Sequence, residues 1–188
     1  AYESPVYYIL NKPTGTVSAT EDRVHKTVID LIYEYEESTD NAHVTVRKDL
    51  FPVGRLDIDT EGLLIITNDG DLAHRLLSPK HHVNKMYFAR LDNPVTQEDV
   101  ELFANGFKVD EELTAMPSKL EILKDNKEAF ITIQEGKFHQ VKRMFAAVGK
   151  EVQYLKRISM GPIVLDDSLH VGECRRLTEE EINLLKNV

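Results

Sequence analysis

Apolar and polar residues along this 188-residue chain alternate in short runs, and the runs predict strands mixed with short helices. Strands are predicted where β-branched and aromatic residues recur at every second position, or form a short apolar run closed by a turn signal. The predicted strands span residues 6–10, 62–67, 85–91, 118–123, 129–134, 152–158, 163–165 and 173–177.

Five segments instead carry apolar residues three or four positions apart, which predicts helices. The strongest is 138–148, where Val141, Met144, Phe145 and Val148 fall on one face. The other predicted helices span 27–35, 71–77 and 96–104, and a last one begins at residue 178 with a capping box.

This order of elements, in which neighbouring strands are interspersed with helices, predicts an α+β fold. The central sheet is expected to be mixed, mostly antiparallel and flanked by helices. Residues 1–5 resemble the end of a linker, and residues 6–188 are expected to form one domain. Pro94 marks the plausible internal boundary, so two subdomains are predicted to meet near residues 93–96.

The net charge of −9 argues at first against a polyanionic partner, but the charges are unevenly distributed. Residues 74–91 contain four Lys or Arg, three His and no acid, and residues 137–176 contain eight Lys or Arg against four acids. A basic face on an acidic body is therefore expected, although each charge run is also compatible with a solvated surface.

Cellular location is constrained by two absences in the sequence. No apolar run approaches the roughly 20 residues of a membrane span. The single cysteine, Cys174, excludes an internal disulfide and is compatible with a reducing compartment. A cytoplasmic protein without membrane contact is predicted, and a monomer is the default expectation.

The segment Asp57–Gly62 (DIDTEG) looks like the opening of a calcium loop, with carboxylates at alternate positions. Counting from Asp57, however, the twelfth position is Asn68, which cannot supply the bidentate carboxylate. Such a loop also leads into a helix, whereas this one runs into a strand. The adjacent His81 and His82 point apart on regular structure, so no zinc pattern is present either. Asp57 remains as a lone carboxylate, which is either a turn former or functional.

Four stretches of the chain form an ordered set of motifs. The central one is GRLD at 54–57, followed by TEGLL and TNDG. The others are NKPTGTVS at 11–18, KMY at 85–87 and EGKFHQVKRM at 135–144. In this order they resemble the motifs of the pseudouridine synthases that modify ribosomal RNA. This resemblance implies the pseudouridine synthase fold, with the active-site cleft between two subdomains. It also implies an isomerase that uses neither cofactor nor metal.

The resemblance carries three catalytic roles onto this chain. Asp57 is expected to be the essential carboxylate, whether it attacks the sugar or the base. Tyr87 is expected to stack on the uracil or to transfer a proton. Lys142 is expected to keep Asp57 ionised in a pocket whose desolvation would favour the neutral acid. Without the resemblance, Tyr87 is as readily a half-buried strand residue, and Lys142 a solvated helix lysine.

The remaining candidates are expected to bind RNA. His139 is predicted to share a helix face with Lys142, beside Gln140, whereas Arg143 lies about 100° further round and is expected to face phosphate. Arg55 is expected to fill the gap left by the flipped uridine or to hold its phosphate, unless it forms a salt bridge with Asp59 or Glu61. Leu155 is expected either to pack against the flipped base or to belong to the core.

Within the family, residues 57–60, 78–82 and 139–149 most resemble the enzymes that modify one uridine of 16S rRNA. The expected partner is therefore 16S rRNA, free or within the assembling small subunit. Members of this type usually carry a small RNA-binding domain in front, so this sequence is expected to be the catalytic domain of a longer protein. The alternatives are the same chemistry on 23S rRNA, a non-catalytic RNA-binding or ribosome-assembly module, and a calcium-binding module.

Overall fold

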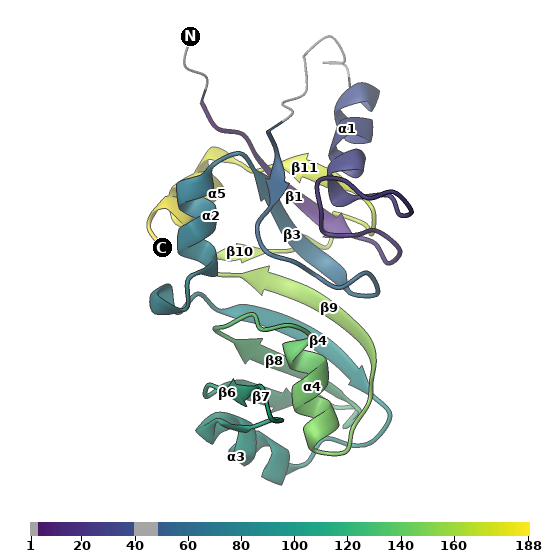
Figure 1. Cartoon of the computed structure of the whole chain (residues 1–188), viewed down its shortest axis with the longest axis vertical. Helices are drawn as coiled ribbons and strands as arrows, with labels where there is room; N and C mark the ends of the chain where they lie inside the picture. The colour runs from purple at the N-terminus through teal and green to yellow at the C-terminus, as the bar shows by residue number, and fades with distance from the viewer. Residues whose placement is uncertain (1–3, 40–48) are drawn as a thin grey trace.

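A computed structural model describes residues 4–39 and 49–188, which build one large sheet with helices on both faces (Figure 1). The main path of the sheet runs β11-β1-β3-β9-β4-β8-β7. These strands are Cys174–Arg176 (β11), Tyr7–Lys12 (β1), Glu61–Thr67 (β3), Val152–Met160 (β9), Lys85–Leu91 (β4), Glu128–Ile133 (β8) and Lys119–Ile122 (β7). Two short strands, Phe51–Pro52 (β2) and Ile163–Val164 (β10), pair with β3 and β9, and Phe107–Lys108 (β5) forms a separate hairpin with Thr114–Ala115 (β6).

The sheet is antiparallel except where β3 meets β9, which confirms the predicted mixed α+β architecture. This parallel contact joins the two halves of the sheet through two residue pairs, Glu61 with Lys156 and Gly62 with Arg157. Gly62 has a φ of 113°, and a Cβ placed there would lie 2.2 Å from the carbonyl oxygen of Arg157. Only glycine therefore allows the two strands to approach this closely.

The helices form two layers, one on each face of the sheet (Figure 1). They are α1 (Val28–Ser38), α2 (Gly70–Leu77), α3 (Gln97–Asn105), α4 (Gln140–Ala147) and α5 (Glu179–Lys186), with a 3₁₀ turn at Pro79–His81. Apolar residues of α1, α3 and α4 share one buried cluster with both halves of the sheet. Those of α2 and α5 form a second cluster on the opposite face of the half that contains β1 and β3. None of these helices is both long and apolar enough to cross a bilayer.

Most predicted elements are confirmed, and the helix predicted from residue 138 is the informative exception. Its regular turns begin only at Gln140, because His139 adopts a left-handed conformation with a φ of 50°. The apolar spacing further along this helix is the same wherever it starts, so periodicity could not reveal the difference. Residues 93–96 form the connection from β4 to α3, and a subdomain boundary there stays a prediction.

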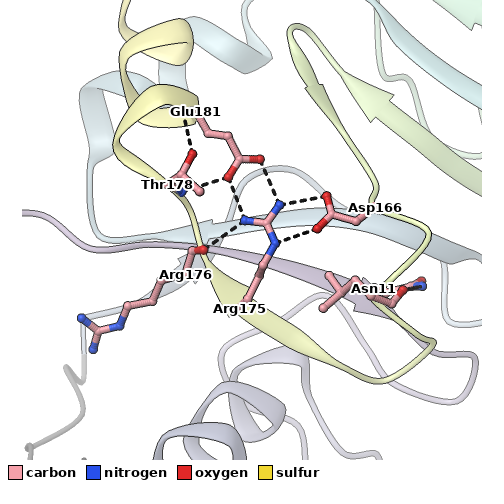
Figure 2. A network of polar contacts seen from close by, with 7 residues as sticks. Asn11, Asp166, Arg175, Arg176, Thr178 and Glu181 are labelled. Atoms are coloured by element: carbon pink, nitrogen blue, oxygen red, sulfur yellow. Dashed lines mark hydrogen bonds and ion pairs between the residues drawn. The ribbon is translucent and has the colours of Figure 1, made fainter.

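The C-terminal segment is fastened to the sheet by a set of ion pairs around Arg175 on β11 (Figure 2). Its guanidinium donates to both carboxylate oxygens of Asp166, at 3.0 and 2.9 Å, and to both of Glu181, at 2.7 and 3.0 Å. Glu181 also completes the predicted capping box with Thr178 at the start of α5. Hydrogen bonds to the two carboxylates raise the pKa of Arg175 above its ordinary value, so the network stays charged.

Candidate active site

A pocket opens between the two halves of the sheet. The loop before β3 supplies one wall, and the loop and first turn of α4 supply the other. Side chains of β4, β8 and β9 complete the lining. The lining includes seven of the eight predicted site residues, namely Arg55, Asp57, Tyr87, His139, Gln140, Lys142 and Leu155.

Asp57 lies in this pocket with two basic side chains against its carboxylate. Lys142 Nζ donates to Oδ2 at 2.8 Å, and His139 Nε2 lies 3.3 Å from Oδ1. The Asp57 side chain is 26% exposed, so it can be reached from the pocket mouth. The structure thus brings together a carboxylate and a lysine that lie 85 positions apart in the chain.

Lys142 bridges Asp57 and a second carboxylate, because its Nζ also donates to Asp59 at 2.7 Å. Burial alone would lower the pKa of Lys142, but the hydrogen bonds to the two aspartates outweigh burial and raise it. The same contact lowers the pKa of Asp59. An ammonium group therefore lies between the two aspartates that the calcium interpretation would have used as ligands. No group of three or more potential metal ligands occurs in the described part of the chain.

The two basic residues beside Lys142 differ from their predicted placement. His139 caps α4 in a left-handed conformation instead of lying within the helix, yet it reaches the same Asp57 carboxylate as Lys142. Arg143 does not line the pocket; it forms a two-pronged ion pair with Asp110, at 2.8 and 2.7 Å. Its Nη1 also donates to the carbonyl of Phe138 at 2.9 Å. The guanidinium thus anchors the loop before α4.

The interior of the pocket is formed by Tyr87 and Leu155, which are 8% and 5% exposed. They come from the adjacent antiparallel strands β4 and β9, where Leu155 pairs with Ala89. Both also belong to the apolar cluster that α3 and α4 cover. An aromatic ring and a branched apolar side chain on a rigid sheet provide a surface suited to a flat base.

Arg55 is exposed at the pocket wall and makes none of the salt bridges considered as alternatives. Asp59 is instead bound to Lys142, and Glu61 accepts a hydrogen bond from the hydroxyl of Tyr154 at 2.7 Å. Within residues 4–39 and 49–188, the Arg55 guanidinium has no ion-pair partner. It is therefore available to a ligand.

Gln140, predicted to contact RNA, is buried and holds the loop that precedes its own helix. Its amide nitrogen donates to Glu135 at 3.0 Å, and its amide oxygen accepts from the backbone N–H of Lys137 at 3.1 Å. Glu135 in turn accepts from the backbone of Met116 at 2.7 Å. Gln140 thus shapes the pocket wall from behind.

Lys12 is a functional candidate that the sequence interpretation missed. This lysine is fully buried, and its ammonium donates to the carbonyls of Pro13, Ile58 and Thr60 at 3.0, 3.3 and 2.9 Å. It therefore fixes the loop that carries Asp57. The only signal in the sequence is a charged residue directly after the apolar run YYIL, within the motif at 11–18.

Stability at alkaline pH is expected to report on Lys12. Burial lowers its pKa from 10.5 to about 8, although the negative charges of Asp59 and Asp57 act to raise it. The folded protein therefore loses this proton between pH 8 and 10.5, where the unfolded chain still holds it. Over that range the free energy of unfolding should rise by about 3 kcal/mol relative to Lys12→Met. Urea unfolding of both proteins at pH 7 and 10.5 measures this difference, and a difference independent of pH would contradict it.

The architecture around this pocket is that of the pseudouridine synthases. A crystal structure of a pseudouridylate synthase superimposes with a TM-score of 0.83 at 40% sequence identity, covering 98% of this chain and 75% of that chain. Residues 6–147 also match the RNA pseudouridylate synthase family. The chain belongs to this family and is accordingly an isomerase that acts on RNA.

Two relatives show where the chain falls within the family. An uncharacterized RNA pseudouridine synthase of Bacillus subtilis, YtzG, is 48% identical over 187 residues, which are 98% of this chain and 74% of the relative. The ribosomal small subunit pseudouridine synthase A of Escherichia coli K12 is 44% identical over 179 residues, 95% of this chain and 73% of the relative. Both are therefore similar along almost the whole of this chain.

Proposed function

We propose that this enzyme isomerises a specific uridine of 16S rRNA to pseudouridine, with Asp57 as the essential group. The observation that carries the proposal is the accessible carboxylate of Asp57, held by Lys142 in a pocket that Tyr87 and Leu155 also line. The choice of 16S rRNA rests on the similarity to an enzyme named for the ribosomal small subunit.

The reaction breaks the bond between N1 of uracil and C1′ of ribose and forms a bond from C5 to C1′. The proton of C5 leaves and N1 gains one, so the product has the same composition as the substrate. Departure of the uracil leaves an electron-poor sugar, which an ionised carboxylate can attack or stabilise. Asp57 is exposed enough to meet either the sugar or the base, and both routes need its charged form.

Lys142 serves this chemistry by fixing the carboxylate in position. A salt bridge made in a partly closed pocket both orients the oxygen atoms and offsets their desolvation. Because Lys142 is shared with Asp59, it remains paired if Asp57 forms a covalent bond and loses its charge. His139 contacts the other Asp57 oxygen and lies where it can meet the ribose or a phosphate.

Tyr87→Phe is expected to lower kcat by about 100-fold and to leave KM within about threefold of wild type. The phenylalanine keeps the stacking surface but removes the hydroxyl, which we assign to transfer of the C5 proton. Single-turnover rates on a 16S transcript measure the effect. A variant with wild-type kcat would reduce Tyr87 to a stacking role.

The substrate is tested by tritium release from C5 of labelled uridine. The wild-type enzyme is offered 16S and 23S rRNA, each free and in partly assembled subunits. Release from 16S rRNA alone is the expected result, and release from 23S rRNA alone would keep the chemistry and overturn the substrate. If no RNA releases tritium but the protein still binds 16S rRNA, a non-catalytic binding module is the better description.

A further inference from the structure

We infer that Phe138 is a stacking platform for the base next to the flipped uridine, taking the place of the neighbour that this base loses. The inference rests on the proposed function, because it assumes that RNA enters the pocket of Asp57. It adds an RNA-contacting residue at the pocket mouth that none of the roles above includes.

The first observation is the exposure of Phe138. Phe138 is 76% exposed, and no other Phe or Tyr in the described part of the chain is as exposed. An isolated phenylalanine so exposed gains nothing for the fold, because its ring remains in water. Phe138 lies in the loop between β8 and α4 and is not itself a lining residue, but its neighbours Lys137 and His139 both line the pocket.

The second observation is that the ring is held in a defined orientation. It stacks on the imidazole of His139, with the ring centres 3.7 Å apart and the planes 21° from parallel. One face of Phe138 is thus covered by His139, and the exposed fraction lies on the remaining faces. A pre-oriented ring loses little conformational freedom when a ligand stacks on it.

The third observation is the rigidity of the backbone that presents this ring. The carbonyl of Phe138 accepts from Arg143, whose guanidinium is anchored on Asp110. The loop is braced from the other side by Gln140, which bonds the backbone of Lys137. His139 keeps a left-handed φ of 50°, a conformation that non-glycine residues retain only where the surroundings enforce it. The backbone that carries Phe138 is therefore fixed relative to the pocket wall formed by its neighbours Lys137 and His139.

The position of the ring relative to Asp57 identifies what stacks on it. The His139 imidazole, on which Phe138 stacks, has its Nε2 3.3 Å from the Asp57 carboxylate. One imidazole ring therefore separates the Phe138 ring from that carboxylate. The flipped uracil belongs on Tyr87 and Leu155 inside the pocket, and the next base along the strand meets the mouth. Unpaired bases stack on aromatic side chains in this way, with little dependence on sequence.

This assignment separates the two roles that Arg55 could play. Phe138 occupies the gap beside the flipped uridine, which leaves the unpaired guanidinium of Arg55, on the opposite wall, for the phosphate backbone. The two contacts differ in kind, because stacking requires a base and the ion pair requires only a phosphate. An RNA without bases therefore distinguishes them.

Binding of two 12-nucleotide probes tests the platform without requiring turnover. One probe is oligoadenylate, and the other is a ribose-phosphate chain of the same length without bases. Phe138→Ala should weaken oligoadenylate binding by about tenfold and leave the abasic probe unchanged. Phe138→Trp should restore binding, whereas Phe138→Leu, apolar but unable to stack, should not. Leu184→Ala on α5, 45% exposed and outside the pocket lining, is the matched control and should bind both probes like wild type.

Folding and catalysis supply the remaining checks. The melting temperature of Phe138→Ala should stay within about 2 °C of wild type, because the ring is mostly in water. On RNA that releases tritium with the wild-type enzyme, Phe138→Ala should raise KM about tenfold. Equal weakening on both probes, or none on oligoadenylate, would overturn the platform even if tritium release proceeds. Failure of tritium release with base-dependent binding would instead overturn the proposed reaction and keep the platform.

Discussion

Replacing Asp57 with asparagine is expected to reduce pseudouridine formation by roughly 10⁴-fold or more, the scale on which loss of an essential nucleophile acts. The amide keeps the size of the side chain but removes the charge that the proposed chemistry requires. Lys142 retains Asp59 at 2.7 Å, so no cation is left unpaired, and the free energy of unfolding should change by less than about 1 kcal/mol. Tritium release under single-turnover conditions, together with urea unfolding, measures both quantities.

Asp59→Asn is the matched control, because Asp59 is the other carboxylate on the same lysine and its side chain is 69% exposed. Its loss leaves the contact between Asp57 and Lys142 in place, so activity should fall by less than about tenfold. Asp57→Asn with more than a tenth of wild-type activity would contradict an essential role. If Asp57→Asn and Asp59→Asn lose activity equally, the loss would be attributed to Lys142, which both carboxylates contact.

Gly62→Ala is expected to lower the free energy of unfolding by about 4 kcal/mol, a large part of the usual stability of a domain. A methyl group here would lie 2.2 Å from the carbonyl oxygen and 2.5 Å from the backbone nitrogen of Arg157. Neither backbone atom can move aside without separating β3 from β9. The φ of 113° adds backbone strain for any residue with a Cβ. The midpoint of urea unfolding, at unchanged slope, measures the loss.

Gly70→Ala provides the comparison for that measurement. Gly70 begins α2, and a Cβ built there meets no atom within 4 Å. Because alanine favours a helix more than glycine does, this variant should be as stable as wild type or up to about 1 kcal/mol more stable. Gly62→Ala within 1 kcal/mol of wild type would show that the strand junction can yield.

The sequence predicted those strands and helices whose formation depends on residues close together in the chain. Strand β4 matches its predicted bounds, because alternating burial of KMYFARL follows from the geometry of a strand. Thr96 and Thr178 begin their helices as expected, because a side chain that caps the backbone acts within three residues. The two-residue strands β2, β5 and β6 were missed, because so short a segment carries no period.

The site was predictable only in part, because its contacts join distant segments. Asp57 and Lys142 were paired through the family motifs, and no spacing along the chain reveals a contact across 85 positions. Arg143 was expected on phosphate because its partner, Asp110, lies in a separate hairpin loop with no local relation to it. Lys12 was overlooked because the carbonyls that bind its ammonium become neighbours only in the folded chain.

The route of the chain through the sheet has a consequence for how such an enzyme can change over evolutionary time. The chain enters the half of the sheet that contains β4 and β9 at Asn84 and leaves it at Gly161. These two points are neighbours, since Lys85 pairs with Met160 and the carbonyl of Asn84 accepts from the backbone N–H of Gly161 at 2.7 Å. One continuous stretch therefore carries Lys142 and the loop before α4, whereas the preceding stretch carries Asp57. Substitutions around α4 can therefore accumulate within that single stretch while the loop that holds the carboxylate is inherited unchanged.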